Sequence, residues 1–140
     1  MLLHIIARGK IGRSPEGDLV DRYVKRLTMP HKITEMPDRG GRLPPAPPGT
    51  VSVMLDEKGQ QLSSMNFARR IEGWRDTGTR ECRFLIGAAD GFDEAARAQA
   101  DLLIAFGAMT WPHMMARAML AEQLWRACSI LANHPYHREG

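Results

Sequence analysis

The sequence predicts an α/β fold with a mostly parallel sheet and helices on both of its faces. Short apolar runs typical of buried strands alternate along the chain with amphipathic segments typical of helices. This alternation has the spacing of strand–helix–strand units, and no internal repeat or low-complexity tract interrupts it. A chain of 140 residues can build one hydrophobic core, so we expect a single domain over residues 1–140.

Each expected element has its own signals. Apolar runs bounded by turn residues predict strands, and the end of the third is set by Asp56 and the turn EKGQQ. Helices are predicted where capping residues precede amphipathic stretches. The sequence RGGRLPPAPPG, with four prolines, is predicted to be a loop. The expected strands are 2–7, 31–36, 51–55, 82–87 and 102–109, and the expected helices are 15–29, 65–77, 93–101 and 112–131.

The last helix is apolar on two sides. At about 100° per residue, one side carries Leu120 and Leu124, and the nearly opposite side carries Met115 and Met119. A helix of this kind is usually covered twice. We therefore expect one side to pack on the sheet and the other on a second subunit.

Arg117 projects from the same side as the buried leucines, one turn after the helix begins. Two interpretations remain open. Its stem can extend along the apolar surface until the charge reaches solvent, as long cationic side chains often do. Alternatively, the guanidinium is held in place to meet an anion near the helix N-terminus.

Three loops follow strands at the edge where ligands bind in parallel sheets: residues 56–62, 87–92 and 107–112. They are rich in glycine and alanine, which let backbone approach a ligand closely. These loops are either ordinary tight turns or the walls of a small-molecule site. Small residues at three strand ends together favour the second interpretation, without specifying the chemistry.

Composition narrows the class of protein. The net charge is +3, and residues 1–42 carry nine Lys/Arg against five Asp/Glu, which is compatible with RNA binding but weak support for it. No apolar run has the length of a membrane span, and the start MLLHIIARGK lacks the features of a signal peptide. We therefore expect a cytoplasmic protein without membrane contact, in which Cys82 and Cys128 are buried thiols.

The C-terminal sequence NHPYHREG is the best candidate for chemistry. His137 can act as a base or a hydrogen-bond donor near neutral pH, Tyr136 can stack or donate, and Arg138 can meet a phosphate. The other interpretation is a frayed polar terminus. His134, His137 and Cys128 do not have the spacing of a zinc site, so no metal is expected.

Six motifs occur together in this chain: HIIARGKIG, DRYVKRL, LDEKGQQLSS, FLIGAADG, MTWPHMMARAMLAEQLWRA and NHPYHRE. In this combination and order, the chain resembles the RlmH family of the SPOUT superfamily over nearly its whole length. The resemblance implies an α/β SPOUT domain with a C-terminal trefoil knot and a homodimer. It also implies transfer of a methyl group from S-adenosylmethionine to N3 of a pseudouridine in helix 69 of 23S rRNA, on the large ribosomal subunit or the 70S ribosome.

The resemblance also implies functional residues. The cofactor would be held by Leu55, Gly87, Phe106, Gly107, Ala108, Met109, Thr110 and Trp111. The catalytic group would comprise His137, Arg138, Tyr136 and Arg117, with the arginines facing RNA and the tail reaching toward the active site, across the dimer in one arrangement.

The chain departs from the family pattern at Ala88, where a glycine is usual, and in residues 37–50, where relatives usually have a helix. The alternative function is that of a non-catalytic RNA- or ribosome-binding domain that keeps the knotted fold.

Overall fold

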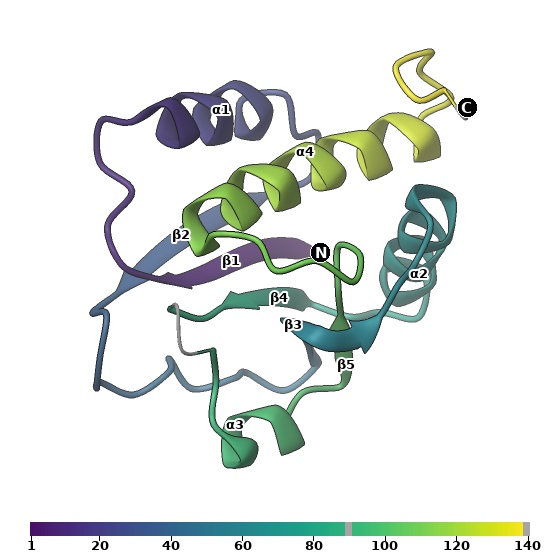
Figure 1. Ribbon diagram of the computed structural model, residues 1–140. Coiled ribbons are helices and arrows are strands. Elements are labelled where there is room, and N and C mark those ends of the chain that lie inside the picture. Colours follow the sequence, from purple (N-terminus) through teal and green to yellow (C-terminus); the bar gives the residue numbers. More distant parts are fainter. Residues whose placement is uncertain (89–90, 139–140) are drawn as a thin grey trace.

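The strands form one parallel sheet in the order β2-β1-β4-β3-β5 (Figure 1). The computed structural model describes residues 1–88 and 91–138, so Ala89 and Asp90 of the turn AADG, and the last two residues of the tail, lie outside the described residues. The α/β class and the parallel sheet are confirmed. The strands are β1 (Leu2–Arg8), β2 (His31–Met36), β3 (Thr50–Gln60), β4 (Glu81–Ile86) and β5 (Leu102–Ile104).

Helices cover both faces of the sheet, as predicted. Figure 1 shows α1, α2 and α4 on one face and α3 on the other. The side chains of Ser14, Ser63 and Asp93 accept backbone N–H groups at the starts of α1, α2 and α3, which satisfies donors that a helix leaves open. The helices are α1 (Pro15–Val24), α2 (Ser64–Asp76), α3 (Glu94–Ala98) and α4 (His113–Leu131).

Three boundaries differ from the prediction by five residues each. Helix α1 stops at Val24 because the chain tightens into short turns before it enters β2. Strand β5 ends at Ile104 although apolar residues continue, because the chain turns at Gly107 with φ of 103°. Strand β3 continues to Gln60, beyond the predicted end at Leu55, through a register shift that places both Leu55 and Gln60 opposite Ile104.

The close contact between the end of β3 and the backbone of β5 requires a glycine at position 59. A Cβ atom at Gly59 would lie 2.6 Å from backbone atoms of Leu103 and Ile104, a distance that real Cβ atoms do not adopt. Residues 56–60, predicted as a turn, therefore lie directly against the last strand.

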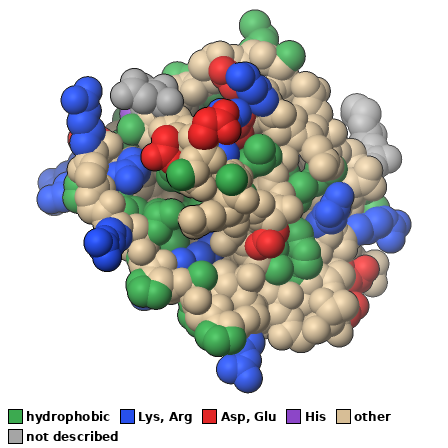
Figure 2. Space-filling view, turned by 90° about the horizontal axis from the view of Figure 1, so that it is seen from below, with side chains coloured by type: hydrophobic (Ala, Val, Ile, Leu, Met, Phe, Trp, Pro, Cys, Tyr) green, Lys and Arg blue, Asp and Glu red, His purple; other side chains and the backbone are tan. Residues whose placement is uncertain are grey.

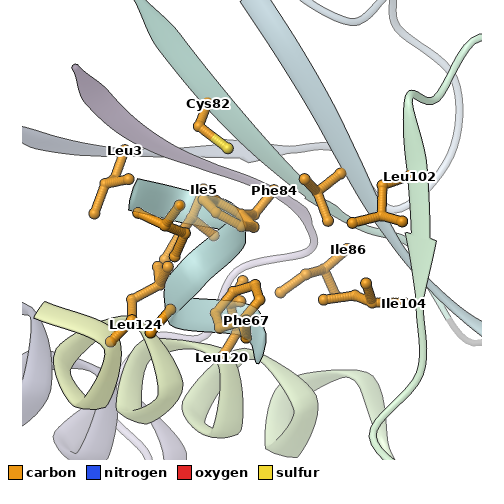
Figure 3. Packing of buried hydrophobic residues seen from close by; sticks show 14 of the residues in the cluster. Leu3, Ile5, Phe67, Cys82, Phe84, Ile86, Leu102, Ile104, Leu120 and Leu124 are labelled. Atoms are coloured by element: carbon orange, nitrogen blue, oxygen red, sulfur yellow. The ribbon is translucent and has the colours of Figure 1, made fainter. Parts of the chain in front are cut away.

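The main core lies between the sheet and the helices α2 and α4 (Figure 3). Leu3, Ile5 and Phe84 from the strands meet Leu120 and Leu124 from α4, and all five are almost fully buried. This confirms the predicted sheet-facing side of α4. Burial also raises the pKa of the Cys82 thiol, which accords with an inert buried cysteine.

The opposite face of the sheet is covered by α3 and by the proline-rich segment 37–49. Leu43 and Phe92 pack on a second cluster that contains Ile6 and Met54. The Arg83 guanidinium fixes the segment, because it donates hydrogen bonds of 2.5 and 2.7 Å to the carbonyls of Pro44 and Pro45. Figure 2, which looks at this side, shows Lys and Arg mostly around its edge with hydrophobic groups between them.

The second apolar side of α4 is only partly covered by the chain itself. Ala118 and Ala121 pack against Val20 of α1, so α1 occupies part of the side predicted to meet another subunit. Met115 and Met119 instead line an open apolar groove of about 550 Å³ between α1, α2 and α4. Met115 is 44% exposed. The predicted partner would have to lie at this groove.

Candidate cofactor site and C-terminal tail

A cavity of about 280 Å³ lies at the carboxyl ends of β3, β4 and β5. Its walls come from the three loops that sequence reasoning singled out and from the first turns of α4. The predicted cofactor residues found in the wall are Leu55, Gly87, Phe106, Gly107, Met109, Thr110 and Trp111. Ala108 belongs to the same loop but is not part of the wall.

Glycines allow the turn after β4 to close. A Cβ atom on Gly87 would come within 3.0 Å of the Gly91 carbonyl carbon and 3.2 Å of the Phe92 ring. Gly91 has φ of 74°, a left-handed conformation that favours glycine, and its N–H donates to the Ala88 carbonyl at 2.8 Å. Ala88, the position that departs from the family pattern, also lines the cavity.

The loop before α4 is held by two side-chain hydrogen bonds. The indole Nε1 of Trp111 donates to the Phe106 carbonyl at 3.0 Å, which closes the loop on itself. The Thr110 hydroxyl donates to Oε2 of Glu57 at 3.2 Å, which ties the loop to the second half of β3. Two walls of the cavity are thereby fixed relative to each other, while Met109 remains 76% exposed at the rim.

Asp56 and Arg97 form a charged part of the wall that sequence reasoning missed. Arg97 Nε lies 2.9 Å from Asp56 Oδ2, and Asp56 Oδ1 also accepts the Lys58 N–H at 2.8 Å. Asp56 follows an apolar strand and was visible in the sequence as a polar residue at a strand end. Its partner was not, because the two residues are 41 positions apart. The cavity therefore offers apolar side chains, close backbone and a small number of charges.

The tail is folded back on α4. The Tyr136 hydroxyl donates to Glu122 Oε1 at 3.0 Å, and Arg126 binds the same oxygen through Nε at 2.8 Å. Arg126 Nη1 lies 3.1 Å from His137 Nδ1, and its guanidinium stacks 4.9 Å from the Tyr136 ring centre. The described part of the tail is therefore held by specific contacts, which does not fit a frayed terminus. An ion pair between Glu122 and Arg126, one helical turn apart, forms the base of these contacts.

Further contacts hold the start of the tail. The Trp125 ring lies 5.6 Å from the His134 ring and 5.7 Å from the Tyr136 ring. Burial and the hydrogen bond to Glu122 raise the pKa of Tyr136 to about 12. Tyr136 is therefore neutral near pH 7 and suited to donate a hydrogen bond. Arg138 is exposed.

Within one chain, the tail and the cavity lie far apart. The cavity is lined by His113 and Ala116 at the start of α4, whereas the tail follows Leu131 at its end (Figure 1). Nineteen helical residues span about 28 Å. The structure thus gathers seven of the eight predicted cofactor residues into one wall, but it does not bring Tyr136, His137 or Arg138 to them.

Arg117 is placed differently from its predicted role. Its side chain is 1% exposed, so it does not extend to solvent, and it meets an anion of its own chain: Nη1 lies 2.6 Å from Glu35 Oε2. Nη2 donates to the carbonyls of Arg8 and Gly9 at 3.2 and 3.0 Å. The predicted direct contact of Arg117 with RNA does not fit this burial, because the charge is already paired inside the molecule.

Within 1–88 and 91–138, no group of three or more His, Cys, Asp or Glu side chains is arranged to hold a metal ion. Over those same ranges, no helix has the length and apolar character needed to cross a bilayer.

The fold and the site lead to a protein class. A family model described as "Predicted SPOUT methyltransferase" matches residues 1–137, and the chain therefore belongs to the SPOUT methyltransferase family. Among curated proteins, the chain is 74% identical over 140 residues to "Ribosomal RNA large subunit methyltransferase H" of Rhizorhabdus wittichii, with both chains covered completely. It is 69% identical, again over the full length of both, to the protein of that name from Novosphingobium aromaticivorans. The resemblance to the RlmH family is thus confirmed.

A solved structure supports the fold independently. A probable methylase family protein from Haemophilus influenzae aligns with a TM-score of 0.57 at 9% identity, covering 94% of this chain and 66% of that one. At this identity the likeness concerns the fold alone.

Proposed function

We propose that this protein methylates N3 of a pseudouridine in helix 69 of 23S rRNA, using S-adenosylmethionine. The substrate is the large ribosomal subunit or the assembled ribosome, so the protein works in the cytoplasm. The observation that carries the proposal is the cavity at the strand ends, whose wall contains seven of the eight residues matched to cofactor positions. Relatives up to 74% identical bear the name of a large-subunit rRNA methyltransferase, which supports the same substrate class.

The residues of the cavity fit the proposed cofactor. Leu55 and Phe106 offer apolar contact for an adenine ring, and the glycine turn at Gly87 leaves room for close backbone contact. Asp56 and Glu57 supply carboxylates beside the cavity, balanced there by Lys58 and Arg97, so the wall offers polar groups of both signs. S-adenosylmethionine supplies an electrophilic methyl group on a positively charged sulfur. The chain itself has to bind the cofactor, orient the base and help remove the N3 proton.

The C-terminal tail supplies the groups that orient the base and help remove the N3 proton. His137 assists removal of the N3 proton or orients the base, Tyr136 donates a hydrogen bond, and Arg138 holds a phosphate or stabilises developing negative charge. Since these residues lie at the far end of α4 from their own cavity, they act on the cavity of a second subunit.

The apolar groove supports a homodimer. It is lined by Leu19, Tyr23, Phe67, Met115 and Met119, among others. Leu19 and Met115 are 38% and 44% exposed, which is unusual for large apolar side chains and marks a surface that a partner covers. Residues 104–107 line both the groove and the cavity, so a second copy bound in the groove lies next to the cofactor.

The knot is part of the proposal as well. The close approach of Gly59, near the end of β3, to the backbone of β5 supports a path in which these two strands cross tightly. This crossing is compatible with the C-terminal trefoil knot implied by the family.

One experiment tests the activity. Ribosomal RNA from a strain lacking this gene is analysed by mass spectrometry before and after complementation. We expect helix 69 to lose one methyl group on the pseudouridine and to regain it with the wild-type gene. If the methyl persists in the deletion strain, the substrate assignment is wrong. If calorimetry also detects no binding of S-adenosylmethionine at millimolar concentration, the non-catalytic RNA-binding alternative replaces the enzyme.

A second experiment tests the shared site. A Gly87→Val subunit with an intact tail is mixed with a His137→Ala subunit with an intact cavity. If the tail acts across the dimer, mixed dimers contain one complete site, and random mixing restores roughly a quarter of wild-type activity. If tail and cavity act within one chain, no combination is complete and the mixture stays inactive.

A further inference from the structure

The loop after β1, residues 9–14, is a basic segment that the proposed mechanism does not use. It carries Lys10 and Arg13, both exposed, and it lies at the carboxyl end of the sheet. Arg8, just before it, donates to the carbonyls of Pro37 and Gly40 and so serves the fold. The two cations of the loop are the ones presented to solvent.

The loop adjoins the candidate cofactor cavity. In the sheet, Ala7 is paired with Ile86, so the residues after β1 lie beside the turn that begins with Gly87. On its other side the loop touches α4, because a Cβ atom at Gly9 would lie 3.1 Å from the Met114 side chain. Ile86, Gly87 and the helix start around His113 all line the cavity. Figure 1 shows the ends of β1 and β4 and the start of α4 on the same side of the molecule.

The backbone of the loop is fixed from inside by the buried Arg117 and its partner Glu35, whose side chain is 34% exposed. Arg117 binds the carbonyls of Arg8 and Gly9, and its partner Glu35 accepts the Ile11 N–H at 2.8 Å. The Arg117–Glu35 pair thus connects three parts of the chain: the end of β1, the middle of the loop, and β2. The Gly9 N–H also donates to the Met36 carbonyl at 2.8 Å.

The far end of the loop is fixed as well. Ser14 donates its hydroxyl to the Ile11 carbonyl at 3.0 Å and accepts the Gly17 N–H at 3.0 Å. Gly17 approaches so closely that a Cβ atom there would lie 2.6 Å from the Gly12 carbonyl oxygen. Lys10 and Arg13 therefore extend from a backbone with little freedom left.

We propose that residues 9–14 form a phosphate-docking loop for the RNA substrate, and that Arg117 is a positioning residue that holds this loop beside the cofactor cavity. The proposal rests on the proposed function and names the surface by which the same site receives its substrate. Phosphate contacts fix the register of a protein on a nucleic acid. A loop that is already ordered loses little conformational entropy on binding. The binding free energy contributed by its two cations is therefore offset little by the cost of ordering the loop.

A buried arginine suits this role. Ion pairs with a solvent-exposed member contribute little to stability, and buried pairs can often be replaced by apolar residues, so stability alone does not explain the Arg117–Glu35 pair. Its particular property is geometric: one guanidinium reaches a carboxylate and two carbonyls of segments that are far apart in sequence. Lysine, with a point charge, does not reproduce that fork.

The test uses the full-length protein, S-adenosylmethionine and large ribosomal subunits purified from the deletion strain. The Lys10→Ala/Arg13→Ala variant is compared with Arg69→Ala/Arg70→Ala, which removes the same charge from exposed positions on α2. We expect the loop variant to raise the KM for subunits about tenfold and to reduce the salt slope of binding by about 1.5. Its affinity for S-adenosylmethionine and its kcat should stay at wild-type values. An equal effect of the α2 variant, or a weakened cofactor affinity, would overturn the proposal.

A double-mutant cycle tests the positioning role. Arg117→Lys alone should raise the KM for subunits, but added to the loop variant it should raise KM no further, because the cations that it positions are gone. Additive effects on KM would mean that Arg117 does not act through the loop. If Arg117→Lys is insoluble, Glu35→Gln enters the same cycle, since it keeps an acceptor for Ile11 and removes the charge.

Failure of the inference and failure of the proposed function are distinguishable. Without methyl transfer by the wild-type protein, the proposed function fails. With normal transfer by the wild type and unchanged KM in the loop variant, only the docking loop is wrong.

Discussion

The Tyr136 hydroxyl donates a hydrogen bond of 3.0 Å to Glu122, the same carboxylate oxygen that binds Arg126. This contact anchors the C-terminal tail to the middle of α4, and it keeps Tyr136 in its neutral form. Burial and Glu122 raise the pKa of Tyr136 to about 12. The tail is therefore organised before any substrate arrives.

The first prediction concerns the pH dependence of this contact. A raised pKa in the folded state means that the stabilisation is fully present below the ordinary tyrosine pKa of about 10 and is lost as pH rises through about 12. Ultraviolet difference spectra should show one of the two tyrosines titrating near 12. Glu122→Gln should move this titration toward 10, and an unchanged titration would mean that Glu122 does not cause the shift.

The second prediction concerns the tail histidine. His137→Ala should reduce methyl transfer, by roughly a hundredfold if His137 moves a proton, while the affinity for S-adenosylmethionine stays unchanged. The matched control is His31→Ala, an exposed histidine on β2 that should leave both quantities unchanged. Single-turnover kinetics and calorimetry measure the two effects separately. Wild-type turnover in His137→Ala would remove this residue from the reaction.

The third prediction concerns the turn after β4. Gly87→Ala places a methyl group about 3 Å from the Gly91 backbone, so the turn must open and the affinity for S-adenosylmethionine should fall about tenfold or more. Gly73→Ala is the control, since a Cβ atom there meets no described heavy atom within 4 Å. In a helix interior that change should add about 1 kcal/mol of stability and leave the cofactor affinity alone. Equal affinities in the two variants would contradict the wall assigned to Gly87.

The fourth prediction concerns the buried His4. Its Nε2 lies 2.6 Å from the Thr34 hydroxyl, and its surroundings include Glu81 and Arg83 from β4 and Lys32 from β2. Burial lowers the pKa of His4 more strongly than Glu81 raises it. The folded state therefore resists protonation, and stability should fall as pH drops below the ordinary histidine pKa of about 6.5. Melting temperatures between pH 7.5 and 5 should decline less steeply in His4→Gln, and equal slopes would exclude His4 as the cause.

The order of strands and helices was predictable because apolar runs and helical periodicity alternate without interruption. The residues of the cofactor wall were reached through the resemblance, and parallel topology then explains why three separate loops meet. Sequence alone did not reveal the Asp56–Arg97 and Glu35–Arg117 pairs, since their members are 41 and 82 positions apart. The end of β5 was misplaced because hydropathy continues past Ile104, whereas the backbone turns at Gly107.

Because the cavity and the tail lie at opposite ends of α4, the length of this helix sets the distance between the two parts of the proposed site. The helix carries the cavity wall at one end and the tail at the other, with 19 residues between its bounds. Deleting one interior residue shortens it by about 1.5 Å and rotates one end relative to the other by about 100°. Such a deletion leaves every proposed ligand-binding residue in the sequence and still misaligns the two halves of the site. Helix α4 thus acts as a spacer, whose number of turns is under the same constraint as the residues at its ends.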